Sequence, residues 1–315
     1  MAQRETRSNE AGKSTLGNIF IIGCGDIGNR VASLAHSTGC LVSALNRSPE
    51  KEELLRSQGI AVVPGNLDEP STLLNLPIAG ATVFYFAPPP GGGIVDPRMR
   101  NFCDAVSAGP KPSKVVYLST SGVYGDCGEM TVTEETPPNP QTARARRRLD
   151  AETTLTCWGE KRGVPVVILR VTGIYGPGRL PIRHLMNGAP LLNEDESPIT
   201  NRIHADDLAK VVLLAGEKGD GGDIFNVSDG EHGTMTGYFN AIADSLGIPR
   251  PGQVTKKEAA EVMPPLLYSY FSESRRIDNS KMLRKLGIKL RYPTLAEGLS
   301  SCIPEDWQPP GIEGR

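Results

Sequence analysis

The chain has few histidines and aromatic residues, no surplus of either charge and no long apolar run. Its 4 histidines lack the spacing of zinc ligands, which argues against a zinc site. A net charge of −2 gives no reason to expect nucleic acid or an anionic membrane as a partner. No apolar run approaches the roughly 20 residues of a membrane span, and residues 1–17 lack the apolar core of a signal peptide. We therefore expect a soluble cytoplasmic protein with a small-molecule partner.

The 6 cysteines include no C-x-x-C pair, so reduced thiols are favoured over a disulfide framework. The segment Gly12–Thr15 looks like the end of a phosphate-binding loop. However, Arg7 stands where that loop requires glycine, and the segment precedes the first expected strand. We interpret residues 1–17 as a disordered lead-in, and residues 312–315 as having the form of an engineered protease-recognition sequence.

The most informative stretch is Asn18–Ala32, which reads as a buried strand, a three-glycine turn and an amphipathic helix. In this motif one glycine permits the tight turn, one lets the backbone approach a pyrophosphate and one allows close packing of helix on strand. The first N–H groups of the helix then face the anion. The turn therefore predicts a dinucleotide site whose contacts are Gly23, Gly25, Asp26, Ile27 and Gly28.

Apolar runs alternate with helical patterns through the first half of the chain, as in right-handed βαβ units on a parallel sheet. Strands are expected at residues 18–22, 41–45, 60–63, 82–86, 114–118, 164–169 and 224–227. A long helix is expected from about Thr142 to Glu160. The predicted fold is α/β, a doubly wound parallel-sheet Rossmann fold with a smaller C-terminal substrate lobe. We expect the dinucleotide domain over 18–175 and the lobe mostly over 176–311, with about 200–230 returning to the first domain.

The end of the second strand indicates which nicotinamide cofactor is preferred. In this fold an acidic residue there binds the 2′-hydroxyl of NAD, whereas a nearby arginine accommodates the 2′-phosphate of NADP. This sequence has Asn46, Arg47 and Ser48 at that place, with no carboxylate before Glu50. We predict a preference for NADP, with NAD as the alternative and an ordinary exposed Arg47 as the competing interpretation.

Five further segments occur in an order that points to one family. They are Gly65–Asp68, Leu118–Asp126, Leu169–Gly178, Asn201–Ala209 and Phe225–Ser228. With the glycine turn, they make the chain resemble the extended short-chain dehydrogenase/reductases, in the NAD-dependent epimerase/dehydratase group, over roughly residues 18–299. The resemblance implies that Asn66 and Leu67 lie by the adenine and that Ala87 and Pro88 border the nicotinamide ribose. It also places Thr120 where the family hydrogen-bonds a substrate oxygen.

The same resemblance exposes a departure. The family uses a tyrosine as acid/base and a lysine four residues later, and here Arg144 and Arg148 stand at those positions. A guanidinium stays protonated in proteins, so Arg144 cannot perform the proton transfer of the tyrosine. We expect Arg148 to bind the ribose or to pair with Glu152. Tyr124, like Tyr175, is a candidate replacement acid that lies in a matched loop.

A further segment, around His204, invites a metal interpretation that we do not favour. We expect Asp206 or a neighbour to cap the following helix and His204 to support the pocket. Ser119–Ser121 lacks the G-x-S-x-G elbow of serine hydrolases.

Two functions stay open. The first is an NADP-preferring oxidoreductase or epimerase acting on a small, sugar-like carbonyl or hydroxyl substrate, with Thr120, Arg144 and Tyr124 as candidate catalytic residues. The alternative is a non-catalytic NADP-binding regulatory or sensor protein. Family analogy adds a homodimer through the long helix.

Overall fold

A seven-stranded parallel sheet is the centre of the fold in this computed structural model, which describes residues 15–263, 268 and 271–308. The strand order is β11-β7-β5-β4-β1-β2-β3. The expected apolar runs form these strands: β1 (Asn18–Ile22), β2 (Leu41–Asn46), β3 (Ala61–Pro64), β4 (Thr82–Tyr85), β5 (Lys114–Thr120), β7 (Val166–Val171) and β11 (Ile224–Val227). The predicted doubly wound α/β class is therefore confirmed.

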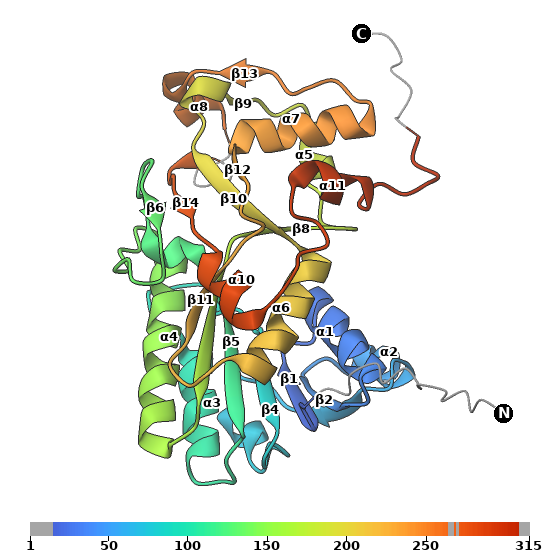
Figure 1. Cartoon of the computed structure of the whole chain (residues 1–315), viewed down its shortest axis with the longest axis vertical. Helices are drawn as coiled ribbons and strands as arrows, with labels where there is room; N and C mark the ends of the chain where they lie inside the picture. Colours follow the sequence, from blue (N-terminus) through green and yellow to red (C-terminus); the bar gives the residue numbers. More distant parts are fainter. Residues whose placement is uncertain (1–14, 264–267, 269–270, 309–315) are drawn as a thin grey trace, which may run out of the picture.

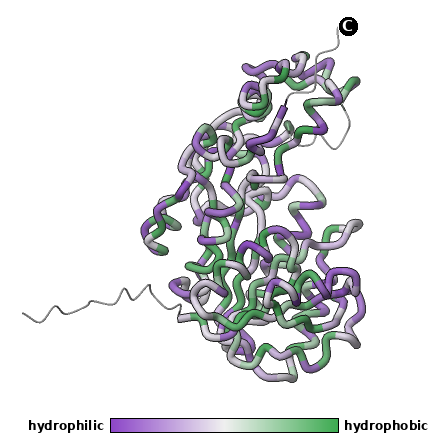
Figure 2. The backbone as a smooth tube through the Cα atoms, turned by 90° about the vertical axis from the view of Figure 1, so that its right-hand side faces the viewer, coloured by the Kyte–Doolittle hydropathy of each residue, from purple (hydrophilic) through white to green (hydrophobic). Residues whose placement is uncertain are grey.

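Helices cover both faces of this sheet (Figure 1). Side chains of α1 (Asp26–Ser37), α6 (Ala205–Lys218) and α10 (Ser280–Leu286) share one apolar core with the sheet. Side chains of α3 (Pro97–Ser107) and α4 (Ala143–Arg162) share the other. α2 (Glu52–Ser57) lies between β2 and β3 in the chain. Because both faces are covered, β4 and β7 are buried at every position, and the apolar tube segments concentrate in this part of the molecule (Figure 2).

The expected long helix begins where the sequence placed it. The hydroxyl of Thr142 accepts a hydrogen bond from the Ala145 amide at 3.2 Å, which caps α4, and Gly163 ends it with a φ of 63°. Arg144 and Arg148 therefore lie in the first two turns of α4, on the face of the sheet that α3 and α4 cover.

The rest of the chain forms a second layer beyond the carboxyl ends of the strands (Figure 1). Its apolar core includes Leu191, Phe239 and Ile242. Its helices are α5 (Ile182–Met186), α7 (Met235–Leu246), α8 (Lys256–Val262) and α11 (Leu295–Ser300). In one small sheet β10 (Ile199–His204) lies between β12 (His232–Thr234) and β8 (Gly173–Tyr175). Two further sheets have two strands each: β13 (Gln253–Val254) pairs with β9 (Leu191–Leu192), and β14 (Arg276–Ile277) pairs with β6 (Thr131–Val132).

After leaving this layer the chain returns twice to the large sheet, first through α6 and β11 and again through α10. The second return was not predicted. Met282 and Leu286 anchor α10 in the core, while Lys281 and Lys285 pair with Asp223.

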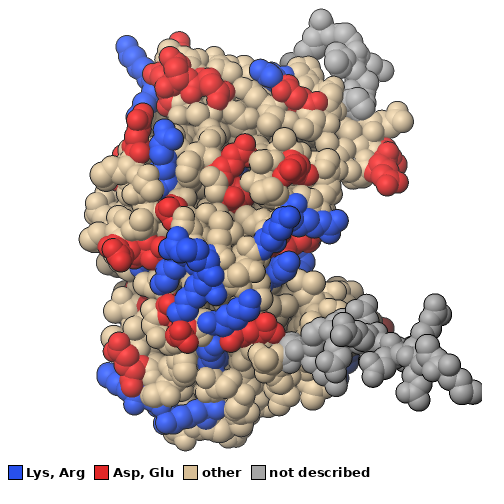
Figure 3. Space-filling view, in the orientation of Figure 1, with Lys and Arg blue, Asp and Glu red and all other residues tan. Residues whose placement is uncertain are grey.

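Lysine and arginine side chains gather across the middle of the face shown in Figure 3.

The predicted cap of α6 needs correction. The helix begins at Ala205, and its N-cap is His204, whose Nδ1 accepts from the Asp206 amide at 3.2 Å. Asp206 instead pairs with Arg30 of α1, which ties the two helices together. Residues 1–14 and 309–315 lie outside the described residues, so the terminal predictions stay predictions there. Residues 15–17 of the expected lead-in are described, and Leu16 is buried in the core of the large sheet. Within the described ranges, none of the helices has the length and apolarity of a membrane span.

Candidate functional site

A cavity of about 580 Å³ opens at the carboxyl ends of β1, β2 and β4. Every residue predicted to contact the cofactor lines it, except Arg148. These lining residues are Gly23, Gly25, Asp26, Ile27, Gly28, Asn46, Arg47, Ser48, Asn66, Leu67, Ala87 and Pro88. The sequence did not single out the lining residues Lys51, Arg98 and Arg179, because they lie outside the fingerprint and approach it only through the fold.

The three glycines of the turn have different local surroundings. Gly23 has a φ of 92°, and a Cβ there would lie 2.6 Å from the Ala87 amide nitrogen, so the turn touches the chain after β4. At Gly28 a Cβ would lie 3.1 Å from the Gly23 carbonyl oxygen. A Cβ on Gly25 would meet no atom within 4 Å, so open space lies in front of the start of α1. The residues present therefore fit a pyrophosphate at the orphan amides of that helix.

Charges around this helix start are largely compensated. Asp26 accepts from Arg30 at 3.0 Å and from Arg179 at 2.9 Å. Arg179 follows β8 in the chain, so the second layer contributes a cation to the wall of the nucleotide cavity. An anion at the amides of α1 would thus meet a carboxylate already paired with two guanidinium groups.

The end of β2 presents a cationic edge to the same cavity. Asn46 holds this turn by donating from Nδ2 to the Ser48 carbonyl at 2.8 Å. Arg47 is 62% exposed and lies 3.8 Å from Asp68. Asp68 binds Arg98 more closely, at 2.6 Å, and the Arg98 guanidinium lowers the pKa of that carboxyl. Arg47 is therefore only loosely held.

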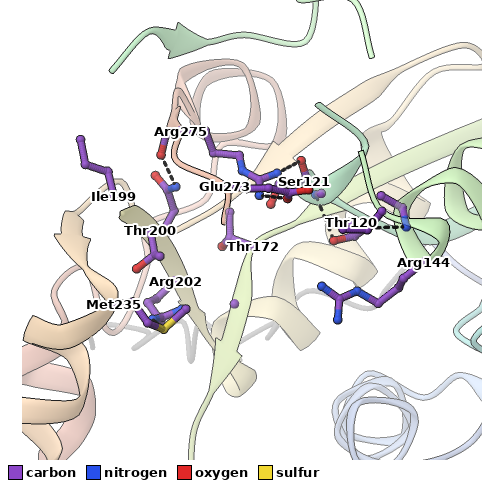
Figure 4. A pocket seen from close by; sticks show the side chains of 15 residues that line it. Thr120, Ser121, Arg144, Thr172, Ile199, Thr200, Arg202, Met235, Glu273 and Arg275 are labelled. Atoms are coloured by element: carbon purple, nitrogen blue, oxygen red, sulfur yellow. Dashed lines mark hydrogen bonds and ion pairs between the residues drawn. The ribbon is translucent and has the colours of Figure 1, made fainter. Parts of the chain in front are cut away.

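Figure 4 shows a second cavity, of about 320 Å³. It shares the strands β5 and β8 with the first cavity. β5 contributes Leu118 to the first cavity and Thr120 to the second. β8 likewise contributes Ile174 to the first cavity and Gly173 to the second. The other lining residues are Ser121, Gly122, Thr142, Arg144, Ala145, Thr172, Ile199, Thr200, Asn201, Arg202, Met235, Glu273 and Arg275. Thr120 and Arg144, predicted as catalytic, thus lie in one cavity beside the nucleotide cavity.

The hydrogen bonds of Thr120 and Glu273 indicate which of their polar atoms are available in this cavity. The Thr120 Oγ1 accepts from the Gly122 amide at 3.2 Å, which leaves its O–H to donate. Glu273 binds Arg275 through Oε2, whereas its buried Oε1 has no hydrogen-bond partner among the described residues. Arg275 also donates to the Ser121 carbonyl at 2.9 Å. Sequence reasoning missed Glu273, because its loop belongs to no recognised motif.

Two predicted site residues lie elsewhere. Tyr124 is 1% exposed, donates to Asn226 Oδ1 at 2.8 Å and lines neither cavity. Burial raises its pKa. Arg148 donates to the Leu118 carbonyl at 2.9 Å and to the Tyr117 hydroxyl at 3.2 Å. It does not pair with Glu152, because Arg170 and Ser119 occupy that carboxylate.

His204 lies apart from both cavities. It is fully buried, and burial lowers its pKa. Its Nε2 lies 3.1 Å from Ser301 Oγ, a contact that superficially resembles a hydrolase pair. Since Nδ1 accepts from a backbone amide, the proton of the neutral ring sits on Nε2, and the ring cannot take a proton from Ser301. No group of potential metal ligands occurs among the residues the structure describes.

Known proteins share both the sequence pattern and the fold. Residues 98–228 match the NAD dependent epimerase/dehydratase family, and residues 19–89 match the TrkA-N domain. This match to the epimerase/dehydratase family covers less than half of the chain. It includes β5, α4 and β7, so the matched residues include Thr120 and Arg144. The predicted family resemblance is confirmed, together with a nucleotide-binding domain.

Individual relatives and solved structures are similar to this chain over most of its length. Protein YeeZ of Escherichia coli is 24% identical over 283 residues, covering 87% of this chain and 96% of that protein. A functionally unknown conserved protein from Silicibacter pomeroyi is 28% identical, with a TM-score of 0.77 over 90% of this chain and 97% of that one. The dTDP-glucose 4,6-dehydratase DesIV of Streptomyces venezuelae, solved with NAD and DAU bound, has a TM-score of 0.74 at 19% identity, covering 90% and 94%. This last likeness shows the fold alone.

Proposed function

We propose that the protein is an NAD(P)-dependent oxidoreductase or epimerase that acts on a small, sugar-like carbonyl or hydroxyl substrate. The observation that carries the proposal is the meeting of two cavities along β5 and β8, one with a dinucleotide fingerprint and one with Thr120 in its wall. A fold alone hosts many chemistries, so the argument rests on the site.

The chain's residues suit a dinucleotide along the whole first cavity. The amides at the start of α1 would bind the pyrophosphate, Asn66 and Leu67 would lie by the adenine, and Ala87 and Pro88 would border the nicotinamide ribose. When bound, the nicotinamide supplies the hydride acceptor or donor. NADP is preferred in this proposal, since Arg47, Ser48 and Lys51 offer donors and positive charge at one end, and none of the described residues that line that edge carries a carboxylate.

On the substrate side, Thr120 and Arg144 donate hydrogen bonds to the substrate oxygen and stabilise negative charge that develops on it. Among the described residues that line this cavity, Glu273 has the only carboxylate, and the others include no histidine, lysine, tyrosine, cysteine or aspartate. In oxidation, the Glu273 carboxylate would accept the proton of the substrate hydroxyl. Tyr124 has no part in this scheme.

One observation favours the alternative of a non-catalytic NADP-binding sensor. The two positions of the family's catalytic pair hold Arg144 and Arg148, and Arg148 is engaged with backbone and Tyr117. A homodimer through α4 stays a prediction.

Binding and turnover separate these functions. We would measure the dissociation constants of NADPH and NADH, then follow nicotinamide absorbance with panels of carbonyl and hydroxyl substrates. We expect tight NADPH binding and turnover that falls at least tenfold in Glu273→Gln and Thr120→Ala. Glu129→Gln, on an exposed loop, is the matched control. Tight binding without turnover by any substrate would favour the sensor, and a failure to bind either nucleotide would refute both.

A further inference from the structure

Arg202 occupies an unusual position in the wall of the second cavity. It lies on β10 opposite Gly173 of β8, and a Cβ on Gly173 would collide with the Arg202 Nη1. One face of the guanidinium packs on the Tyr238 ring, with its central carbon 3.8 Å from the ring centroid. Figure 4 shows Arg202 beside Met235, on the opposite side of the cavity from Arg144.

The donors of this guanidinium are largely unused. Its Nη2 contacts Met235 Sδ at 3.2 Å, and sulfur is a weak acceptor. The buried Nε has no partner, and Arg202 forms no ion pair with any residue in the described part of the chain. The guanidinium is only half-buried, but its buried Nε has no acceptor, and a bound anion would supply one together with a compensating charge.

Neighbouring charges do not supply that compensation. Asp229 exerts an attractive field on Arg202 but makes no ion pair with it, and burial raises the pKa of Asp229 to about 7. The only carboxylate among the described lining residues, Glu273, is bound to Arg275. With Arg144 also present, the second cavity holds three guanidinium groups and one carboxylate.

We propose that Arg202 binds an oxyanion group of the substrate, so that the ligand of this cavity is a small molecule carrying a carboxylate or a phosphate. This inference rests on the proposed function insofar as it takes the second cavity to be the substrate site. The planar fork of arginine matches both oxyanions, and Tyr238 and Met235 hold the fork in place. Gly173 provides the space that the guanidinium fills.

Anion binding to the full chain tests the proposal directly. Inorganic phosphate and malonate would each be titrated by calorimetry into protein saturated with NADP⁺, in a buffer without other oxyanions. We expect saturable binding of at least one probe, weakened at least tenfold in Arg202→Gln. Stronger phosphate binding would assign a phosphorylated substrate, and stronger malonate binding a carboxylate.

Two further variants keep the test sharp. Gly173→Ala retains the charge but displaces the guanidinium, so it should weaken the anion severalfold. Arg284→Gln, which removes an exposed arginine of α10 outside the cavity, should leave anion binding unchanged. Anion binding that is absent, or equal in Arg202→Gln and the unaltered protein, overturns the proposal. NADPH affinity measured on the same variants reports separately on the proposed function, because Arg202 lies outside the nucleotide cavity.

Discussion

Arg170 of β7 donates to the Glu152 carboxylate of α4 at 2.8 Å, and both side chains are only 4% exposed. Ser119 of β5 donates to the same carboxylate, so one buried acid joins a helix to two adjacent strands. The Arg170 guanidinium also lies over the Tyr124 ring, 4.8 Å from its centroid. This cluster sits behind Thr120, the last residue of β5, and helps to fix the wall of the second cavity.

Removing one member of the Arg170–Glu152 pair should make the protein less stable. We expect Glu152→Ala to lower the free energy of unfolding by about 3–5 kcal/mol, because Arg170 would remain as a buried charge without its partner. Urea denaturation followed by circular dichroism measures the loss. The double variant Glu152→Met/Arg170→Met should recover much of it, and an unchanged midpoint in the single variant would contradict the argument.

Arg47 should distinguish the two nicotinamide cofactors. Its loose contact with Asp68 leaves its donors available for a 2′-phosphate. We expect Arg47→Ala to weaken NADPH about tenfold, or ~1.4 kcal/mol, and to change NADH little. Fluorescence titration provides both constants, with Arg56→Ala on α2 as the control, since that arginine pairs with Glu52 within the helix. Equal affinities for the two nucleotides in the unaltered protein would sink the proposed preference.

Local patterns in the sequence predicted the seven strands and the glycine turn, because buried strands are continuous apolar runs and the turn needs glycine at fixed steps. The second return to the sheet escaped prediction, since α10 has only 7 residues and buries only Met282 and Leu286. Likewise, Arg148 was expected to contact Glu152 or the ribose, but in the fold the Glu152 carboxylate pairs with Arg170. Glu273 reaches the cavity from a segment that no motif marks, whereas Arg202 belongs to the matched segment Asn201–Ala209, in which the sequence analysis gave it no role.

The pKa of Asp229 makes a prediction about pH. Burial raises it to about 7, against ~3.9 in an unfolded chain. The folded state therefore holds this proton more tightly, so the group favours folding at low pH and that contribution disappears as pH rises from about 4 to about 7. Asp229→Asn keeps Oδ1 as an acceptor for the Glu231 amide and removes the charge.

We therefore expect Asp229→Asn to raise the free energy of unfolding by about 2–4 kcal/mol above pH 7 and to change it little below pH 4. Denaturant titrations at several pH values test this, with the exposed Asp104→Asn as the control. Parallel pH profiles for Asp229→Asn and the unaltered protein would show that the carboxyl is not perturbed.

Alanine substitutions at Gly23 and Gly25, the first two glycines of the turn, should separate an effect on stability from an effect on nucleotide binding. Alanine at Gly25 meets no atom within 4 Å and needs no positive φ, so Gly25→Ala should fold with nearly normal stability. Its methyl group would instead occupy the space in front of α1, and we expect NADPH affinity to fall at least a hundredfold. Alanine at Gly23 needs a φ of 92° and would lie 2.6 Å from the Ala87 nitrogen, so Gly23→Ala should lose stability by several kcal/mol. Thermal unfolding and nucleotide titration of both variants separate the two effects. Full NADPH affinity in a folded Gly25→Ala protein would mean that the open space before α1 does not hold the pyrophosphate.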